Sequence, residues 1–407
     1  MPSSKEVALG ARRDPRRRAE YLQRERTLPW IVRFDHGSRV KDVEHDSTPR
    51  PTVVRNVQAL RAVAAILVVL VHASGIEGRY FPDQHPILGP FGILGYTGVD
   101  IFFVISGFIM FTTTATKFAK RGASLTFLSR RFIRIYPPYW LVLIPMITIY
   151  LFAPERLTQF HPVHDNLLAS FLLLPQMTSP LVAVSWTLVF EMYFYIIFSF
   201  LLMVRRRYVV PALAIWFCVQ LAVFAVFGQS KNVYLAFLGN PISLEFIFGI
   251  AVGLLYVNKC FLPPLIAVVV MIAASFALIA STSFLGFIPE LERAFVWGIP
   301  AMLLVYAAVG LEARKTAIAP TWAVSLGDSS YAMYLWHLLV LIGISQLIAR
   351  YHPHGFLLHM LVLIAMFAIL IVFSQSVYRY VELPMTRYLN ARFTVGRQRA
   401  GVRSDAA

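Results

Sequence analysis

The sequence predicts an all-α, polytopic membrane protein with about ten transmembrane helices. Of its 407 residues, 58% are hydrophobic and only 14% are charged, and the mean hydropathy is +0.65. Soluble domains of this size are about 25% charged. Apolar stretches that approach the ~20 residues of a membrane-spanning helix also recur along the chain. We expect the spans at 57–75, 95–116, 137–153, 182–204, 208–228, 240–258, 262–282, 294–312, 329–350 and 356–380.

The distribution of basic residues predicts that both termini lie in the cytoplasm. If the N-terminus is inside, the even-numbered loops carry twelve Lys and Arg residues and the odd-numbered loops carry five, and basic loops stay on the cytoplasmic side. This interpretation gives a basic, disordered extension over 1–52, a membrane domain over 53–388 and a basic tail over 389–407. Loops and tails therefore account for the net charge of +16, and we expect no nucleic-acid partner.

The two cysteines, Cys218 and Cys260, are too far apart for a CxxC motif or a zinc-binding pattern. We therefore expect neither redox chemistry nor a metal site.

The first span contains the two polar residues around which the functional prediction is built, Arg61 and His72. They are eleven residues apart, so on a helix they lie within about 20° of the same face and roughly 16 Å apart along the axis. Between them the face carries Ala64, Ala65 and Val68, and it is narrow enough for a ligand or another helix to approach. A histidine at this depth is a functional candidate, although a hydrogen bond to a neighbouring helix is the simpler explanation.

Asp100 lies near the start of the second span, at about the depth of His72. Its carboxylate could bind the second ring nitrogen of His72 and fix the tautomer of the imidazole. The alternative is an acid in the first turn of a helix, favoured by the helix dipole.

Three arginines precede the third span, Arg130, Arg131 and Arg134. One helical turn would bring them together, and guanidinium groups suit phosphate oxygens. The alternative is that they only fix the topology of the loop. In the fourth span, Glu191 is an acid among aromatic residues with Tyr195 one turn away, so it either pairs with a buried cation or acts as an acid or base.

The ninth span places Ser330, Tyr334 and His337 on one helical face. Such a face either contacts a substrate or joins two helices. We assign the aromatic and polar side chains of the fourth and ninth spans to substrate binding; they are Trp186, Tyr195, Tyr334 and His337.

Six short motifs follow one another in register. They are R-x10-H from Arg61 to His72, GVDIFFVISGF at 98–108, RRFIRIYPPYW at 130–140, SWTLVFEMYFY at 185–195, SYAMYLWH at 330–337 and ELP at 382–384. In this order the chain resembles the acyltransferase 3 family over residues 53–388. Within that family it is most similar to the exopolysaccharide O-acetyltransferases of the succinoglycan type.

The resemblance implies a multi-pass enzyme of the bacterial inner membrane that transfers an acyl group from acetyl-CoA to a carbohydrate hydroxyl. His72 matches the essential histidine of the family and Arg61 its paired arginine. Arg130, Arg131 and Arg134 match the arginine motif of the second cytoplasmic loop, and Glu191 matches the acid of the fourth helix. The implied partners are acyl-CoA, a carbohydrate acceptor and the lipid bilayer.

These expectations combine into one mechanism. Arg61 and the loop arginines hold the phosphates of coenzyme A, and the pantetheine arm follows the small-residue face of the first span. His72 then activates the hydroxyl or takes the acyl group itself, while Asp100 orients it and Glu191 assists. Two other classes remain open: a transporter of acyl groups or lipid-linked sugars, and a structural membrane subunit.

Overall fold

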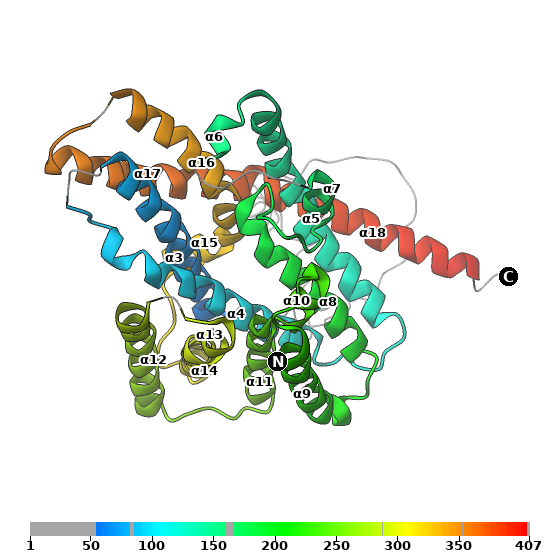
Figure 1. Cartoon of the computed structure of the whole chain (residues 1–407). Coiled ribbons are helices and arrows are strands. Elements are labelled where there is room, and N and C mark those ends of the chain that lie inside the picture. Colours follow the sequence, from blue (N-terminus) through cyan, green and yellow to red (C-terminus); the bar gives the residue numbers. More distant parts are fainter. Residues whose placement is uncertain (1–53, 82–84, 159–165, 287, 352, 405–407) are drawn as a thin grey trace, which may run out of the picture. The chain divides into compact units, whose positions relative to one another are not determined.

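The computed structural model describes residues 54–81, 85–158, 166–286, 288–351 and 353–404, excluding the side chains of Pro90 and of residues 394–404. The extension predicted over 1–52 lies outside this range. Ten of the described helical segments are long and apolar enough to cross a membrane (Figure 1). This confirms the all-α, polytopic prediction.

The described α-helices, in chain order, are α3 (Arg55–Tyr80), α4 (Thr97–Thr114), α5 (Ala123–Phe152), α6 (Glu155–Thr158), α7 (Leu167–Leu172), α8 (Trp186–Leu201), α9 (Val209–Phe227), α10 (Val233–Gly239), α11 (Leu244–Val257), α12 (Pro264–Leu285), α13 (Glu290–Val296), α14 (Gly298–Ala313), α15 (Thr321–Asp328), α16 (Ser330–Tyr351), α17 (Phe356–Val377) and α18 (Leu383–Ser404). A π-helical turn, Tyr378–Glu382, joins α17 to α18. The tail predicted over 389–407 is therefore helical as far as Ser404.

Helix α4 packs against α3 and α11 with almost no side chain between the backbones. A Cβ atom at Gly107 would lie 2.1 Å from the carbonyl oxygen of Phe246 in α11, and one at Gly249 would lie 2.0 Å from that of Val104. At Gly98 a Cβ atom would lie 2.5 Å from the carbonyl oxygen of Ala64 in α3. Only glycine permits such approaches, so these three positions fix α4 as a rigid wall of the site described below.

Helix α5 extends further toward its N-terminus than the sequence suggested. We predicted that the third span begins at Pro137, but α5 begins at Ala123 and runs through Pro137, Pro138 and Pro145. Proline has a helical φ, but it lacks an N–H and its ring crowds the carbonyl of residue i−4. A helix can continue past it where the surroundings support the freed backbone groups. The Pro137–Pro138 pair leaves two carbonyls without intrahelical donors, those of Ile133 and Arg134. The arginines predicted in a loop thus lie on the first half of a long helix.

The N-terminus of α3 is anchored by the end of α14. Glu312 accepts hydrogen bonds from the backbone N–H groups of Arg55 (2.8 Å) and Asn56 (2.6 Å). The side chain of Asn56 in turn donates to the carbonyl of Ala308 and accepts from the N–H of Ala319. A carboxylate at a helix N-terminus satisfies free N–H groups and complements the helix dipole. This anchor fixes where α3 begins, and therefore how deep Arg61 lies within the helical bundle.

Candidate active site

A hollow of 840 Å³ opens at the ends of α3, α4 and α5 and is lined by many basic side chains. The basic lining residues are Arg61, Lys117, Lys120, Arg121, Arg130, Arg131 and Arg134. The acids in the lining are Asp328 and Glu382. Among the described residues, no carboxylate forms a salt bridge with Lys117, Lys120, Arg121 or Arg130. The hollow therefore carries a surplus of positive charge.

Lys117 shows the electrostatic cost of this arrangement. Burial lowers the pKa of its ammonium group, and the nearby positive charges of Arg130, Arg131 and Lys120 lower it further. A bound anion would relieve this repulsion. The hollow is thus suited to a ligand with several negative charges.

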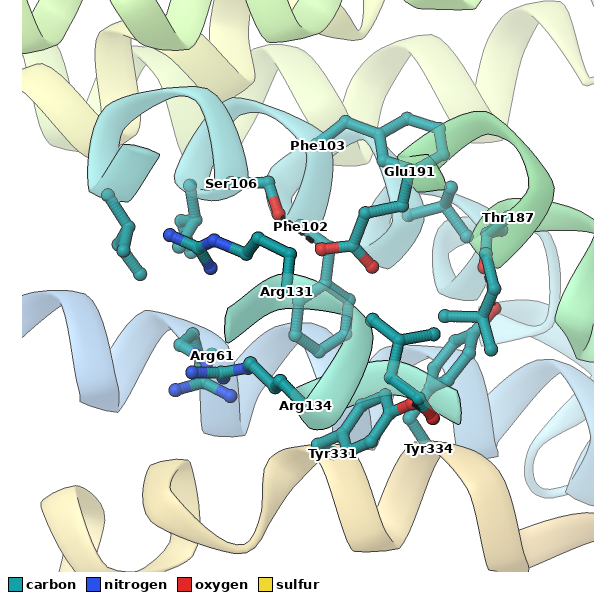
Figure 2. A pocket seen from close by; sticks show the side chains of 15 residues that line it. Arg61, Phe102, Phe103, Ser106, Arg131, Arg134, Thr187, Glu191, Tyr331 and Tyr334 are labelled. Carbon is teal, nitrogen blue, oxygen red and sulfur yellow. Dashed lines mark hydrogen bonds between the residues drawn. The ribbon is translucent and has the colours of Figure 1, made fainter. Parts of the chain in front are cut away.

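A smaller chamber of 80 Å³ adjoins the hollow and extends between α4, α5, α8 and α16 (Figure 2). Both spaces are lined by Arg61, Arg131, Arg134 and Ile109, so the three arginines stand where the two meet. Beyond them the chamber wall is mostly apolar and aromatic. Its other lining residues are Val99, Phe102, Phe103, Ile105, Ser106, Ile135, Thr187, Leu188, Glu191, Tyr331 and Tyr334.

The structure brings Arg61 together with two of the three predicted arginines. Arg61 is only 8% exposed, and its Nη1 atom donates to Oε1 of Gln58 at 2.8 Å. The Arg131 guanidinium lies 5.2 Å from the ring centroid of Tyr195, a cation–π distance. Arg134 projects toward Arg61 in Figure 2. Arg130 is exposed and lines only the outer hollow.

Glu191 points into the chamber from α8 (Figure 2) and is held by two hydroxyl groups. Its Oε1 atom accepts a hydrogen bond from Ser106 at 3.0 Å and another from Tyr195. Tyr195, which we predicted to bind substrate, is fully buried and does not line the chamber. It lies instead between Arg131 and Glu191, and so connects the arginine to the acid.

His72 does not line the chamber but is connected to Tyr334 in its wall through His337. Its Nδ1 atom is 3.0 Å from the carbonyl oxygen of Val68 and 3.3 Å from Nε2 of His337. The ring of His337 is 4.9 Å from that of His72 and 6.2 Å from that of Tyr334, centroid to centroid. A continuous row of rings therefore connects the chamber wall to His72, although His72 itself does not line the chamber.

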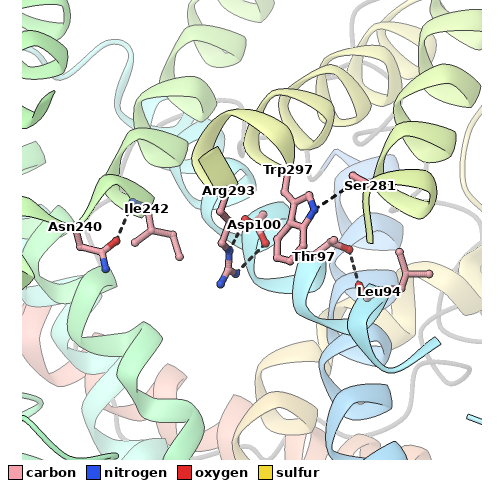
Figure 3. A network of polar contacts seen from close by, with 8 residues as sticks. All are labelled: Leu94, Thr97, Asp100, Asn240, Ile242, Ser281, Arg293 and Trp297. Carbon is pink, nitrogen blue, oxygen red and sulfur yellow. Dashed lines mark hydrogen bonds and ion pairs between the residues drawn. The ribbon is translucent and has the colours of Figure 1, made fainter. Parts of the chain in front are cut away.

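Asp100 does not contact His72, and the predicted orienting role is wrong on this geometry. Both of its carboxylate oxygens accept from Arg293 of α13, at 3.1 and 3.0 Å, as Figure 3 shows. Trp297 packs against the same guanidinium, and the Cζ atom of Arg293 lies 5.1 Å from the centroid of the tryptophan ring. Asp100 is fully buried, so this ion pair neutralises a charge in the interior.

The small-residue face of α3 is closed, which corrects the predicted path of the pantetheine arm. Ala64 and Ala65 are fully buried, and Gly98 of α4 packs against the backbone of Ala64. Ala65 packs in a cluster with Met333 of α16 and Leu370 of α17. Of the two possible occupants of this face, a ligand or another helix, neighbouring helices fill it, and the chamber lies beside α4 instead.

The other residues that we predicted to bind substrate lie in separate parts of the structure. Tyr334 lines the chamber, and its hydroxyl donates to the carbonyl of Val184 at 2.6 Å and contacts Thr187. His337 contacts His72 directly. Trp186 lies apart from both, in a hollow of 390 Å³ on the other face of α8, together with Phe190 and Phe237.

Several residues of the site were missed or misread from the sequence. Lys117, Lys120 and Arg121 were counted only as topological charges, and Arg293 was counted as an outer-loop residue. Ser106 and Tyr331 belong to motifs that were recognised, but nothing in their spacing marked them as chamber residues. Within the described ranges, no three His, Cys, Asp or Glu side chains are arranged to hold a metal ion.

Comparison with known proteins identifies the family of the chain. A family model described as an acyltransferase domain, that of the acyltransferase 3 family, matches residues 54–379. The exopolysaccharide production protein ExoZ of Rhizobium meliloti (strain 1021) is 32% identical over 278 residues, covering 66% of this chain and 80% of that protein. The acyltransferase MdmB of Streptomyces mycarofaciens is 26% identical over 323 residues, covering 72% and 80%.

No solved structure shows a significant match to the chain. The family match covers most of the chain, including every helix that contributes to the chamber. The chain therefore belongs to the acyltransferase 3 family and is a membrane acyltransferase.

Proposed function

We propose that this protein transfers an acetyl group from acetyl-CoA to a hydroxyl of an exported carbohydrate. The observation that carries the proposal is the junction between a wide basic hollow and a narrow apolar chamber, with three arginines where they meet. Coenzyme A has the same two parts, a nucleotide with three phosphate groups and a slender pantetheine arm. In the bacterial inner membrane the basic hollow would face the cytoplasm, where acyl-CoA is found.

The donor would bind with its phosphates among the basic side chains and its arm in the chamber. Arg61, Arg131 and Arg134 can each give forked hydrogen bonds to phosphate oxygens, whereas Lys117, Lys120 and Arg130 add positive charge further out. Glu191 is linked to Arg131 through Tyr195, whose hydroxyl donates to the acid and whose ring packs against the guanidinium. We assign it the role of an anchor that holds the arginines in place when no donor is bound.

The row of rings from Phe102 and Tyr334 to His337 leads from the chamber to His72. His72 does not line the chamber, so these side chains would have to move aside for the thioester to reach the imidazole, where the acceptor hydroxyl is activated. A carbohydrate acceptor is supported by the relative ExoZ, which is named for exopolysaccharide production. In this scheme residues 53–388 form the catalytic membrane domain, and both termini lie in the cytoplasm.

The direct test uses purified protein in nanodiscs with acetyl-CoA labelled in the acetyl group, with and without a panel of glycans. We expect label to appear on a glycan together with release of the coenzyme A thiol. Label retained on the protein before any glycan is added would show an acyl-enzyme. Neither product in nanodiscs, together with labelled acetyl groups or lipid-linked sugars that cross the membrane unchanged when the protein is placed in proteoliposomes, would refute the proposal in favour of a transporter.

A second prediction concerns the junction of the two spaces. Arg134→Ala removes a forked donor to phosphate, so the KM for acetyl-CoA should rise by ~10- to 100-fold, with a smaller change in kcat. Arg134→Lys should give an intermediate KM, because an ammonium group keeps the charge but not the fork. The measurement is initial rate against acetyl-CoA concentration at saturating acceptor.

Arg205→Ala is the matched control, because Arg205 is exposed in a loop and does not line the hollow. Its KM should equal that of the wild type. If the KM of Arg134→Ala were unchanged as well, Arg134 would serve only to fix the membrane topology and would not bind the donor.

A further inference from the structure

The backbone around His72 and His337 dictates which nitrogen of each ring carries hydrogen. A carbonyl oxygen can only accept, so the Nδ1 atom of His72, 3.0 Å from the oxygen of Val68, must be the donor. The Nδ1 atom of His337 lies 2.8 Å from the oxygen of Tyr334 and 3.2 Å from that of Met333, and is a donor for the same reason. In neutral rings, both Nε2 atoms therefore have a free lone pair.

The two rings then fit together in one direction only. Nε2 of His337, as an acceptor, faces the Nδ1–H of His72 at 3.3 Å, and that hydrogen is shared with the carbonyl of Val68. His72 is partly exposed, and its Nε2 atom has no hydrogen-bond partner among the residues that the structure describes. The lone pair of His72 is thus directed away from the protein's own hydrogen bonds, as a base requires.

His337 is well suited to hold its neighbour in place. Its side chain is fully buried, and its orientation is fixed by two carbonyls of its own helix, α16. Tyr334, one turn earlier, is itself tied to Val184. The ring that faces His72 is therefore held rigidly. A group that orients another side chain has to be held in this way.

We propose that His337 is a positioning residue for His72. It accepts the Nδ1–H of His72, keeps the lone pair of Nε2 available, and stabilises the imidazolium that forms during the reaction. The inference rests on the acyl transfer proposed above and deepens it. A neutral imidazole here takes the place that a carboxylate occupies in a Ser-His-Asp triad.

The acyl transfer needs no reactant other than the thioester and the acceptor hydroxyl. The acceptor hydroxyl gives its proton to Nε2 of His72 as its oxygen forms a bond to the thioester carbonyl carbon. The C–S bond then breaks, and the leaving sulfur takes the proton back from Nε2. The products are the carbohydrate ester and the thiol of coenzyme A, and in between His72 carries a positive charge next to the Nε2 lone pair of His337.

The mutational test compares two replacements of similar size. In His337→Gln the amide oxygen can accept near the position of Nε2, so kcat should stay within about threefold of the wild type. His337→Leu removes the acceptor, and kcat should fall by ~10- to 100-fold with both KM values unchanged. Wild-type activity in His337→Leu, or equal losses in two folded variants, would overturn the proposal.

His359→Gln serves as a control for the loss of a buried imidazole, because His359 contacts Glu77 and Phe81 and not His72. The folded fraction of this variant should have the wild-type kcat. A lowered kcat there would show that any buried histidine produces the effect, and would remove the case for His337.

The tautomer can be measured without any assay of activity. Protein labelled with ¹⁵N-histidine, compared with the same protein carrying His72→Ala, identifies the two ring nitrogens of His72 by NMR. We expect the neutral ring to be protonated at Nδ1. Protonation at Nε2 in an active wild-type protein would overturn the positioning role alone, whereas absence of acetyl transfer by the wild type would refute the proposed function.

Discussion

Replacing His72 with alanine is expected to reduce acetyl transfer by ~10²- to 10⁴-fold, the usual contribution of a general base. The protein should still accumulate and bind acetyl-CoA, because His72 lines neither the chamber nor the basic hollow. The measurement is transfer of labelled acetyl groups to a glycan per amount of folded protein, with donor affinity measured separately.

The matched control is His354→Ala, which removes the same ring from an exposed position before α17. This variant should have the wild-type rate. If His72→Ala also retained the wild-type rate, His72 would have no part in the mechanism, and the positioning role of His337 would fall with it.

The second large effect is expected on stability, from Arg293→Met. This change leaves Asp100 buried without its guanidinium partner, and breaking one side of a buried ion pair costs about 3–5 kcal/mol. Glu245 makes the site more sensitive, because its buried carboxyl group lies beside that of Asp100 and both acids face the same arginine, Arg293. Thermal unfolding in detergent would measure the loss.

Arg156→Met provides the comparison, because Arg156 is exposed on α6 and should contribute little. The same experiment separates stability from catalysis. The Arg293→Met protein that remains folded should keep kcat close to that of the wild type, because neither Arg293 nor Asp100 contacts His72. A specific loss of kcat with unchanged stability would return Asp100 to the catalytic role predicted from the sequence.

Much of the architecture could be read from the sequence, because the bilayer imposes a strong and simple constraint. A span needs about 20 apolar residues, and all ten predicted stretches correspond to helical segments long enough to cross. The convergence of Arg61, Arg131 and Arg134 was also predictable. The spacing of Arg131 and Arg134 puts them on one face of a helix, and side chains that bind the same phosphates are expected to lie together.

The partners of buried groups could not be predicted, because they depend on which helices pack together. Asp100 and Arg293 are 193 positions apart, and nothing local distinguishes this arginine from those that only fix topology. The face of α3 between Arg61 and His72 was equally ambiguous, since small residues admit a ligand or a helix. Because Gly98 approaches that face closely, a neighbouring helix and not a ligand occupies it.

The prolines within α5 have a consequence for the stiffness of the helix that carries the arginines. Because Pro137 and Pro138 cannot donate, the turn that joins the arginine-bearing half to the rest of the helix lacks two backbone hydrogen bonds. Bending there breaks fewer bonds than bending elsewhere in α5. The turn is thus the place where α5 resists bending least, and Arg130, Arg131 and Arg134 all lie on its N-terminal side.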